Sequence, residues 1–330
     1  MPKRRPPRVA LVGCGDLSTR AYMPTLRWAH RYGRCRWAAL CDLNADLVAE
    51  RAAQFKVPRT YTDVAELVEA ETLDGIFVVV SVGATARVAG LTLKRGLPTY
   101  LEKPPGRTAK ECEALIRAAA SSGAPNQVAF NRRYTPPIRL LRDRMQRYGG
   151  IHSASAVMYR YRRLEPTFIV STAIHALDAL RFLAGDITRA QARRTRLPDG
   201  DADSFIIDID YATGGFGTLD VLPDVGVRAE RYTAHGPRTT GFAQVPGPRN
   251  CIDDPGACQL YHAGKPVRLP NPFGRRRDVP TPIACGFHAE ILAFLTCLTT
   301  DATPAPSLAE SLQSLEVLEV ISKNRTYRLR

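Results

Sequence analysis

The sequence predicts an α/β protein in which a doubly wound parallel sheet is followed by an α+β domain with an open, mostly antiparallel sheet. Up to about residue 130, short apolar runs alternate with helical patterns, as in a parallel sheet with helices on both faces. A glycine-rich turn directly follows the first apolar run. After about residue 150, strand-like runs follow one another instead. We therefore divide the chain into residues 1–132 and residues 133–330, and we allow the closing helices to pack back on the first domain.

The first domain has the clearest strands and helices. The run Gly75–Val82 is the strongest strand, because it is continuous, apolar and β-branched, as in strands covered on both faces. Gly96 is placed to end a helix, and Thr108 with Glu111 forms a capping box for the next one. We expect strands at Arg8–Gly13, Trp37–Asp42, Gly75–Val82, Pro98–Leu101 and Gln127–Phe130. We expect helices at Thr19–Tyr32, Ala45–Phe55, Asp63–Glu69, Ala84–Arg95 and Thr108–Ser121.

The second domain has a different pattern. Ile151–Arg163 alternates along its length and is expected to be a long strand, while Thr172–Leu183 is expected to be one helix. Residues 236–282 are rich in proline and glycine and are expected to be mostly loop. We expect further strands at Ser204–Tyr211, Phe216–Leu222 and Arg228–Ala234, and closing helices at His288–Leu298 and Leu308–Ser322.

Composition limits the classes of protein to which the chain can belong. Hydrophobic residues make up 45% and charged residues 24% of the chain, which are ordinary values for a globular protein. No apolar run approaches the roughly 20 residues that span a bilayer. No apolar stretch of signal-peptide length follows the basic N-terminus. We therefore expect a cytoplasmic protein that does not associate with a membrane.

A formal net charge of +14 raises the question of nucleic-acid binding. The basic residues are spread along the chain, and no helix-turn-helix, zinc-finger or aromatic RNA-binding motif accompanies them. We therefore expect no nucleic-acid partner, and an anionic substrate and plain compositional bias both stay open. The eight cysteines form no CxxC pair, so we expect reduced thiols and no bound metal.

The turn after the first strand predicts a dinucleotide-binding site. Gly13 permits a tight turn, and Gly15 lets the backbone approach a pyrophosphate. The helix that follows offers N–H groups and its positive dipole end to that anion. Ser18 stands where a third glycine is usual and is small enough for close helix packing. We assign cofactor contacts to the whole turn, namely Gly13, Cys14, Gly15, Asp16, Leu17 and Ser18.

Asp42, at the end of the second predicted strand, indicates which dinucleotide is bound. A carboxylate at this place can accept both hydroxyls of the adenosine ribose and repels a 2′-phosphate. No arginine follows Asp42 directly, so we favour NAD over NADP. The alternative is a turn without a ligand, in which Asp42 is only the N-cap of the next helix.

Three motifs resemble those of the Gfo/Idh/MocA family, which is named after glucose–fructose oxidoreductase, inositol dehydrogenase and a rhizopine catabolism protein. Glu102-Lys103-Pro104 follows a short strand, and Phe130-Asn-Arg-Arg-Tyr134 follows the next one. The helix that contains His175-Ala-Leu-Asp178 and ends at Gly185 is the third motif. The resemblance covers most of the chain except residues 236–282.

The resemblance implies a Rossmann domain that holds NAD and a C-terminal α/β domain. It implies hydride transfer between nicotinamide and a hydroxyl or ketone of a sugar, cyclitol or sugar nucleotide. It also implies a homodimer or homotetramer formed through the last strands. Further cofactor contacts are implied for Ser81, Glu102, Lys103 and Asn131. Substrate contacts are implied for Lys103, Arg132, Tyr159, Ser171, Thr172 and His175.

Lys103 and His175 are the candidate catalytic residues. Oxidation of an alcohol needs a base for the hydroxyl proton beside the nicotinamide, and Lys103 can serve as that base. His175 can bind the substrate hydroxyl or share its proton with Lys103. On one continuous helix Ser171, His175 and Asp178 would be neighbours, and Asp178 would either fix the histidine tautomer or serve the fold. A surface lysine and a core histidine are the structural alternatives.

The chain departs from the family pattern at Ser171, where the family helix usually has an aspartate. A serine hydroxyl can form hydrogen bonds but cannot act as a carboxylate base. The stretch Ser81–Thr85 also lacks the proline and histidine that often follow the fourth strand in the family. Three functions stay open: an NAD(P)-dependent oxidoreductase acting on CH–OH groups, an NAD-dependent glycoside hydrolase or lyase, and a non-catalytic NAD-binding regulator.

Overall fold

The computed structural model divides into two compact units. Unit 1 comprises Met1–Ala129 and Phe287–Leu312, and unit 2 comprises Phe130–Gly286 and Gln313–Arg330. Among the residues that the structure describes, every helix is too short or too polar to cross a bilayer. The described residues are 5–197, 202–246, 256–274 and 279–329.

A six-stranded parallel sheet forms the centre of unit 1. The strand order is β3-β2-β1-β4-β5-β6, and every neighbouring pair is parallel. The order reverses between β1 and β4, so the loops that leave these strands diverge and open a crevice at their carboxyl ends. The strands are β1 (Arg8–Val12), β2 (Arg36–Cys41), β3 (Arg59–Tyr61), β4 (Gly75–Val78), β5 (Thr99–Leu101) and β6 (Asn126–Val128). The predicted doubly wound fold is confirmed.

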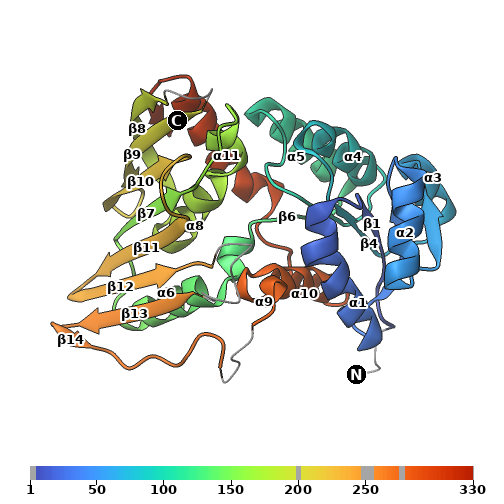
Figure 1. The fold of residues 1–330 in the computed structure, drawn as a ribbon, viewed down its shortest axis with the longest axis horizontal. Helices are drawn as coiled ribbons and strands as arrows, with labels where there is room; N and C mark the ends of the chain where they lie inside the picture. The colour runs from blue at the N-terminus through green and yellow to red at the C-terminus, as the bar shows by residue number, and fades with distance from the viewer. Residues whose placement is uncertain (1–4, 198–201, 247–255, 275–278, 330) are drawn as a thin grey trace. The chain divides into compact units, whose positions relative to one another are not determined.

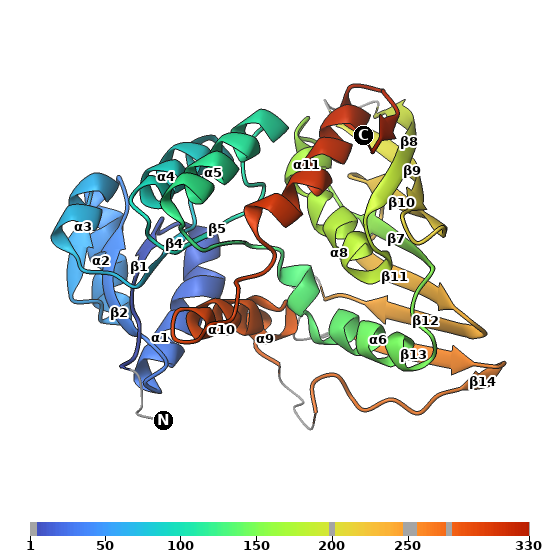
Figure 2. The same cartoon turned by 180° about the vertical axis from the view of Figure 1, so that it is seen from behind.

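Helices cover both faces of the unit 1 sheet. Figures 1 and 2 show α4 and α5 on one face and α1 and α10 on the other. The helices of this unit are the π-helix η1 (Ser18–Tyr22), α1 (Met23–Arg31), α2 (Ala45–Phe55), α3 (Val64–Ala70), α4 (Val82–Lys94), α5 (Ala109–Ser122) and α10 (Phe287–Cys297). Helix α11 (Leu308–Ser322) begins in unit 1 and ends in unit 2.

Strand β4 is shorter than the sequence predicts. Its last ladder bond comes from Val79 N–H to Val12 O at 2.8 Å. Ser81 is then the N-cap residue of α4, so Val82 opens a helix instead of ending a strand. The apolar run crosses from strand to helix without a change of residue type, and its periodicity therefore does not mark the boundary.

A nine-stranded mixed sheet forms unit 2. The order is β14-β13-β12-β11-β7-β10-β9-β8-β15, with β7 and β10 parallel and the other neighbours antiparallel. Its strands are β7 (Ser153–Tyr159), β8 (Ile187–Arg196), β9 (Asp203–Tyr211), β10 (Phe216–Leu222), β11 (Ala229–Gly236), β12 (Thr239–Gln244), β13 (Ala257–His262), β14 (Lys265–Pro266) and β15 (Tyr327–Arg328). Its helices are the 3-10 helix η2 (Asn131–Tyr134), α6 (Pro136–Arg147), α7 (Phe168–Ser171), α8 (Ile174–Ala184) and α9 (Thr281–Ala284). Figure 2 shows α6 and α8 on the same face of this sheet.

The expectation of a loop at residues 236–282 is wrong, because β12, β13 and β14 lie there. Within this range, residues 247–255 and 275–278 lie outside the described residues. Gly241 misleads sequence analysis. A Cβ at this position of β12 would lie 2.3 Å from Leu141 Cδ1 of α6, so glycine lets this helix pack on the strand without a shift of the leucine side chain. Strand β8 and helix α6 were also not expected from the sequence.

The predicted single helix Thr172–Leu183 is in fact preceded by a separate short helix. Helix α7 ends at Ser171, and α8 begins at Ile174. Ser171 and His175 therefore do not share the continuous helix that the sequence analysis expected. His175 and Asp178 do lie on α8, where both are buried.

Gln127 is a buried amide in the core of unit 1. It stands in register with Tyr100, and Tyr100 with Phe77, so the three side chains share one face of the sheet. The rings of Phe77 and Tyr100 both contact Phe294 of α10. Both polar atoms of the Gln127 side chain are buried without a hydrogen-bond partner among the described residues. An amide in this state costs about 1–3 kcal/mol of stability.

We expect Gln127→Met to raise the free energy of unfolding by about 1 kcal/mol, because the substitution removes the unsatisfied amide at similar volume. Urea denaturation of purified protein measures the change. Gln54→Met, at an exposed position of α2, is the control and should leave stability unchanged. A clear loss of stability in Gln127→Met would show that the amide has a partner.

Candidate functional site

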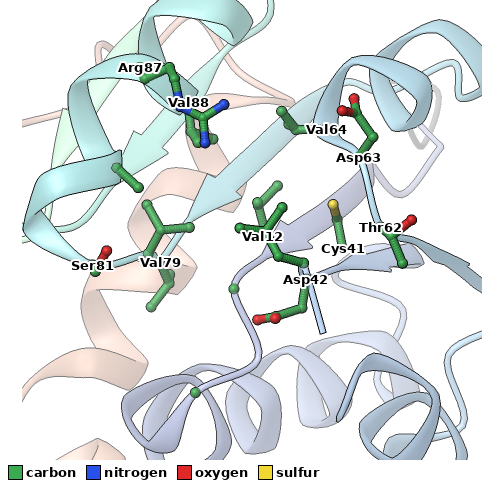
Figure 3. Close-up of a pocket in the computed structure, with 15 residues that line it drawn as sticks. Val12, Cys41, Asp42, Thr62, Asp63, Val64, Val79, Ser81, Arg87 and Val88 are labelled. Atoms are coloured by element: carbon green, nitrogen blue, oxygen red, sulfur yellow. The ribbon is translucent and has the colours of Figure 1, made fainter. Parts of the chain in front are cut away.

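A pocket of about 290 Å³ lies at the carboxyl edge of the unit 1 sheet. Its walls are formed by the loops that follow β1, β2, β3 and β4 and by the first turns of α4, as Figure 3 shows. This is the crevice at which the strand order reverses, where open α/β sheets bind their ligands. The lining residues are Val12, Gly13, Gly15, Cys41, Asp42, Leu43, Thr62, Asp63, Val64, Val79, Val80, Ser81, Ala84, Arg87 and Val88.

The turn after β1 needs glycine at its first position and leaves space at its third. Gly13 has a φ of +98°, and a Cβ there would lie 2.0 Å from Val79 O. The Gly13 N–H donates to Cys41 O at 2.8 Å, which ties the turn to β2. A Cβ at Gly15 would meet nothing within 4 Å, and the helix begins with the next residue, Asp16. Open backbone at a helix N-terminus is the arrangement that a pyrophosphate requires.

The Asp42 carboxylate is held by the same turn. Its Oδ2 accepts the Cys14 N–H at 2.7 Å, and its Oδ1 accepts the Asn44 N–H at 3.0 Å. Each oxygen keeps capacity for a further donor, such as a ribose hydroxyl. The N-cap of α2 is Asn44, whose side chain accepts from Leu47 N–H, so the alternative role of Asp42 as that cap is wrong. The pocket therefore fits a dinucleotide.

Sequence analysis missed four polar or sulfur-bearing side chains of this pocket, namely Cys41, Thr62, Asp63 and Arg87. Asp63 lies after β3 and caps α3 through Ala65 N–H at 2.5 Å. Arg87 reaches in from α4 on the side opposite Asp42 in Figure 3. Burial and the nearby Asp42 charge raise the pKa of Cys41 to about 12, so it is a neutral thiol. For Cys41, Thr62 and Asp63, the place at or next to the carboxyl ends of β2 and β3 is the signal that could have found them.

The loop after β5 carries Glu102 and Lys103. Glu102 is buried, and its carboxylate accepts the Lys103 backbone N–H at 3.1 Å and the Tyr22 hydroxyl. The Glu102 N–H donates to Val78 O at 3.0 Å, which continues the ladder with β4. The Lys103–Pro104 peptide is cis. Glu102 therefore holds the backbone of the loop from which the Lys103 side chain extends.

In unit 2, the segment Asn131–Tyr134 is bound to the helix that carries His175 and Asp178. Arg133 of η2 donates two hydrogen bonds to the Asp178 carboxylate of α8, both at 2.7 Å. The Asp178 side chain is fully buried, and the bidentate pair uses both of its oxygens. Asp178 therefore serves the fold. His175 is 8% exposed, and its ring meets Phe130 edge to face at 6.3 Å.

Arg132 is bound to Glu230 of β11 in the same unit. Its Nε and Nη2 each lie 2.9 Å from a Glu230 oxygen, and Arg160 adds a third bond at 2.6 Å. Burial alone would raise the pKa of Glu230, but the two guanidinium groups hold it well below its usual range. Asn131 Nδ2 donates to Cys285 O at 2.8 Å. The contacts of Asn131 and Arg132 are thus with the protein itself.

Comparison with known proteins identifies the family. Residues 7–130 match the oxidoreductase family with an NAD-binding Rossmann fold, and residues 159–326 match the C-terminal alpha/beta domain of that family. The chain belongs to the Gfo/Idh/MocA oxidoreductase family. The predicted family, the predicted enzyme class and NAD as cofactor are confirmed.

Relatives in the Gfo/Idh/MocA family include sugar and cyclitol dehydrogenases. D-Apiose dehydrogenase of Paraburkholderia graminis is 29% identical over 279 residues, 72% of either chain. Inositol 2-dehydrogenase of Burkholderia ambifaria is 28% identical over 318 residues, covering 91% of this chain and 88% of that one. Levoglucosan dehydrogenase in complex with NADH has a TM-score of 0.83 at 18% identity, covering 99% of this chain and 100% of that one. This last likeness shows the fold alone.

The candidate residues of the Gfo/Idh/MocA pattern fall into separate places. Gly13, Gly15, Asp42 and Ser81 line one pocket, which Cys14 joins through its backbone N–H. Asp16 instead pairs with Arg20 on the surface. The two remaining residues of the turn, Leu17 and Ser18, lie inside the helix, where Ser18 is buried. Lys103 belongs to unit 1. Tyr159, Ser171, Thr172 and His175 belong to unit 2.

We expect Gly15→Ala to weaken NADH binding about 100-fold while unfolding stays unchanged, because the added methyl meets no protein atom but obstructs an approaching pyrophosphate. Gly13→Ala is the matched contrast. Its methyl collides with Val79 O, so it should lose about 3 kcal/mol of stability. Fluorescence titration with NADH and thermal unfolding separate the two effects. Unchanged NADH binding by a folded Gly15→Ala would place the pyrophosphate elsewhere.

Proposed function

We propose that the chain transfers a hydride between NAD and a CH–OH group of a sugar or cyclitol, with Lys103 as acid/base. The Asp42 carboxylate, fixed in the pocket at the end of β2, is the observation that carries this proposal. Its negative charge accepts ribose hydroxyls and repels the 2′-phosphate of NADP. The names of the relatives, apiose and inositol dehydrogenases, support a polyhydroxylated substrate.

The division of the chemistry follows from the residues. NAD, when bound, accepts the hydride of the carbinol carbon. Lys103 would take the hydroxyl proton, so the hydride and the proton of the alcohol go to different acceptors, NAD and Lys103. His175 would bind the substrate hydroxyl. Ser171 replaces the acid that is usual in the family, so Lys103 carries the proton transfer alone or together with His175.

Two alternatives make different predictions in the same assay. An NAD-dependent glycoside hydrolase releases p-nitrophenol from aryl glycosides without a net gain of NADH absorbance. A regulator binds NADH, shows no turnover and is indifferent to substitution of Lys103. Assembly into a homodimer or homotetramer and a cytoplasmic location stay predictions.

We expect Asp42→Asn to weaken NADH binding about tenfold and to leave NADPH binding unchanged or stronger. The amide oxygen still accepts the Cys14 N–H, so the turn keeps its shape while the charge is lost. Fluorescence titration with both cofactors measures the ratio of the two dissociation constants. Asp46→Asn, exposed on α2, is the control and should not change the ratio. Equal binding of NADH and NADPH by the unaltered protein would contradict the assignment.

We expect Lys103→Met to lower kcat for sugar or cyclitol oxidation by about 100-fold or more, because general acid–base catalysis contributes this much. The dissociation constant for NADH should stay within about twofold, since Lys103 is not among the residues that line the pocket. Stopped-flow absorbance of NADH measures hydride transfer. Lys94→Met, exposed at the end of α4, is the control. Full activity in Lys103→Met would refute the assignment of the acid/base.

A further inference from the structure

Four buried polar side chains form a continuous row in unit 1, which we call the buried row. The Tyr22 hydroxyl contacts Glu102 Oε1 and lies 3.2 Å from the Tyr100 hydroxyl. The Tyr100 hydroxyl lies 2.8 Å from Glu290 Oε2. Tyr22, Tyr100 and Glu290 are 0% exposed, and Glu102 is 5% exposed. A carboxyl group thus stands at each end of the row, and two phenols link them.

The row is assembled from four separate parts of unit 1. The π-helical turn η1 supplies Tyr22, β5 supplies Tyr100, the following loop supplies Glu102, and α10 supplies Glu290. Contact between α10 and η1 brings the helix that carries Glu290 against the turn that carries Tyr22, and α10 lies beside α1 in Figures 1 and 2. Aromatic rings surround the phenols, namely Phe77, Phe287 and Phe294. The carboxyls are therefore removed from water in apolar surroundings.

The hydrogens in the row can be counted. The row has three links, and each needs one hydrogen between its two oxygens. Burial in apolar surroundings is the largest cause that holds the pKa values of Tyr22 and Tyr100 well above their usual range, so each phenol keeps its hydrogen. Two phenols supply two hydrogens. The phenol–phenol contact of 3.2 Å becomes a hydrogen bond beside the other two only when a carboxyl group supplies the third hydrogen.

We propose that the buried row holds one additional proton, shared between its two end carboxyls through the phenols. It rests on Glu290, which is fully buried, and leaves Glu102 ionised. Glu102 accepts the Lys103 N–H and the Tyr22 hydroxyl, and hydrogen bonds of this kind stabilise a carboxylate. A shift of all three hydrogens by one step would neutralise Glu102 and ionise Glu290, with every heavy atom in place. Two carboxyl groups sharing one proton avoid the cost of two buried charges.

The shared proton has a consequence for Lys103, and this consequence rests on the proposed function. Glu102 fixes the backbone N–H of Lys103, so the charge of its carboxyl group determines how firmly the Lys103 loop is held. Tyr22 and Glu290 are then positioning residues that act through Glu102. They lie on elements other than the loop itself, and η1 follows the glycine-rich turn directly.

Infrared difference spectroscopy of the protein without cofactor tests the shared proton. The protonated carboxylic acid has a carbonyl band that is separate from the carboxylate bands and shifts in D2O. Glu290→Gln should lack one such band that the wild-type spectrum contains, because the glutamine amide can supply the third hydrogen itself. Tyr100→Phe, which breaks the row at its middle, should keep the band but shift its frequency. Glu50→Gln, at an exposed carboxylate of α2, should lose carboxylate bands only.

Two results would overturn the shared proton. One is a Glu290→Gln difference spectrum that contains only carboxylate bands, since both ends would then be ionised. The other is a protonated band that is indifferent to Tyr100→Phe, since its proton would then lie outside the row. Thermal unfolding confirms that each variant is folded, and Tyr100→Phe provides a reading if Glu290→Gln does not fold.

The positioning role is tested with Tyr22→Phe, which removes the hydroxyl that binds Glu102. We expect kcat to fall about tenfold or more while the dissociation constant for NADH stays within about twofold. Parallel losses of kcat, NADH affinity and thermal stability would show a packing role only and overturn the link to Lys103. Absence of hydride transfer in the wild-type protein would refute the proposed function, while the infrared result would still decide on the shared proton.

Discussion

The close approach of two backbones, at Gly13 and Val79, determines the shape of the pocket. A Cβ at Gly13 would lie 2.0 Å from Val79 O, so β1 and β4 can end side by side only if the turn after β1 begins with glycine. The turn then directs the Cys14 N–H to Asp42, which fixes the carboxylate at the end of β2. Because Gly15 faces open space, the same turn leaves the helix N-terminus accessible. One steric constraint thus couples the fold of unit 1 to its capacity for a dinucleotide.

Buried carboxylates impose a second constraint, which the structure meets in two ways. Asp178 and Glu230 in unit 2 are each bound by an arginine of the short segment Asn131–Tyr134, and Glu71 in unit 1 is paired with Arg8 and Arg59. Glu102 and Glu290 in unit 1 are linked to each other through two phenols, which can donate or accept a hydrogen. An ion pair fixes a charge at one residue, whereas a row of hydroxyls allows a proton to transfer from one carboxyl group to the other. Unit 1 is also the unit that carries Lys103.

Local patterns predict those parts of the structure whose cause is local. Helix α2 begins and ends where its apolar periodicity does, and Gly13, Gly15 and Asp42 could be assigned from the ends of successive strands, whereas Ser81 came from the family resemblance. Contacts over long sequence distances leave no such pattern. Glu290 lies 190 residues from Tyr100, and Glu230 lies 98 residues from Arg132. Arg87 could not be assigned without knowing which strand ends adjoin. The proline and glycine content of residues 236–282 suggested a loop, although Gly241 lies in β12 where the side chains of α6 pack on the strand.

Because Ser171 stands where the family usually has an aspartate, the question is which other acidic group acts on Lys103. Ser171 ends α7, and Thr172 and Ala173 separate it from α8, which carries His175. Asp178 is fully engaged by Arg133 and provides no substitute carboxylate. Glu102, by contrast, is adjacent to Lys103 in the chain and already binds its backbone. If the proton of the substrate passes through Lys103, the acidic group that conditions this step is therefore Glu102, and the proton balance of the site is set within the cofactor-binding unit.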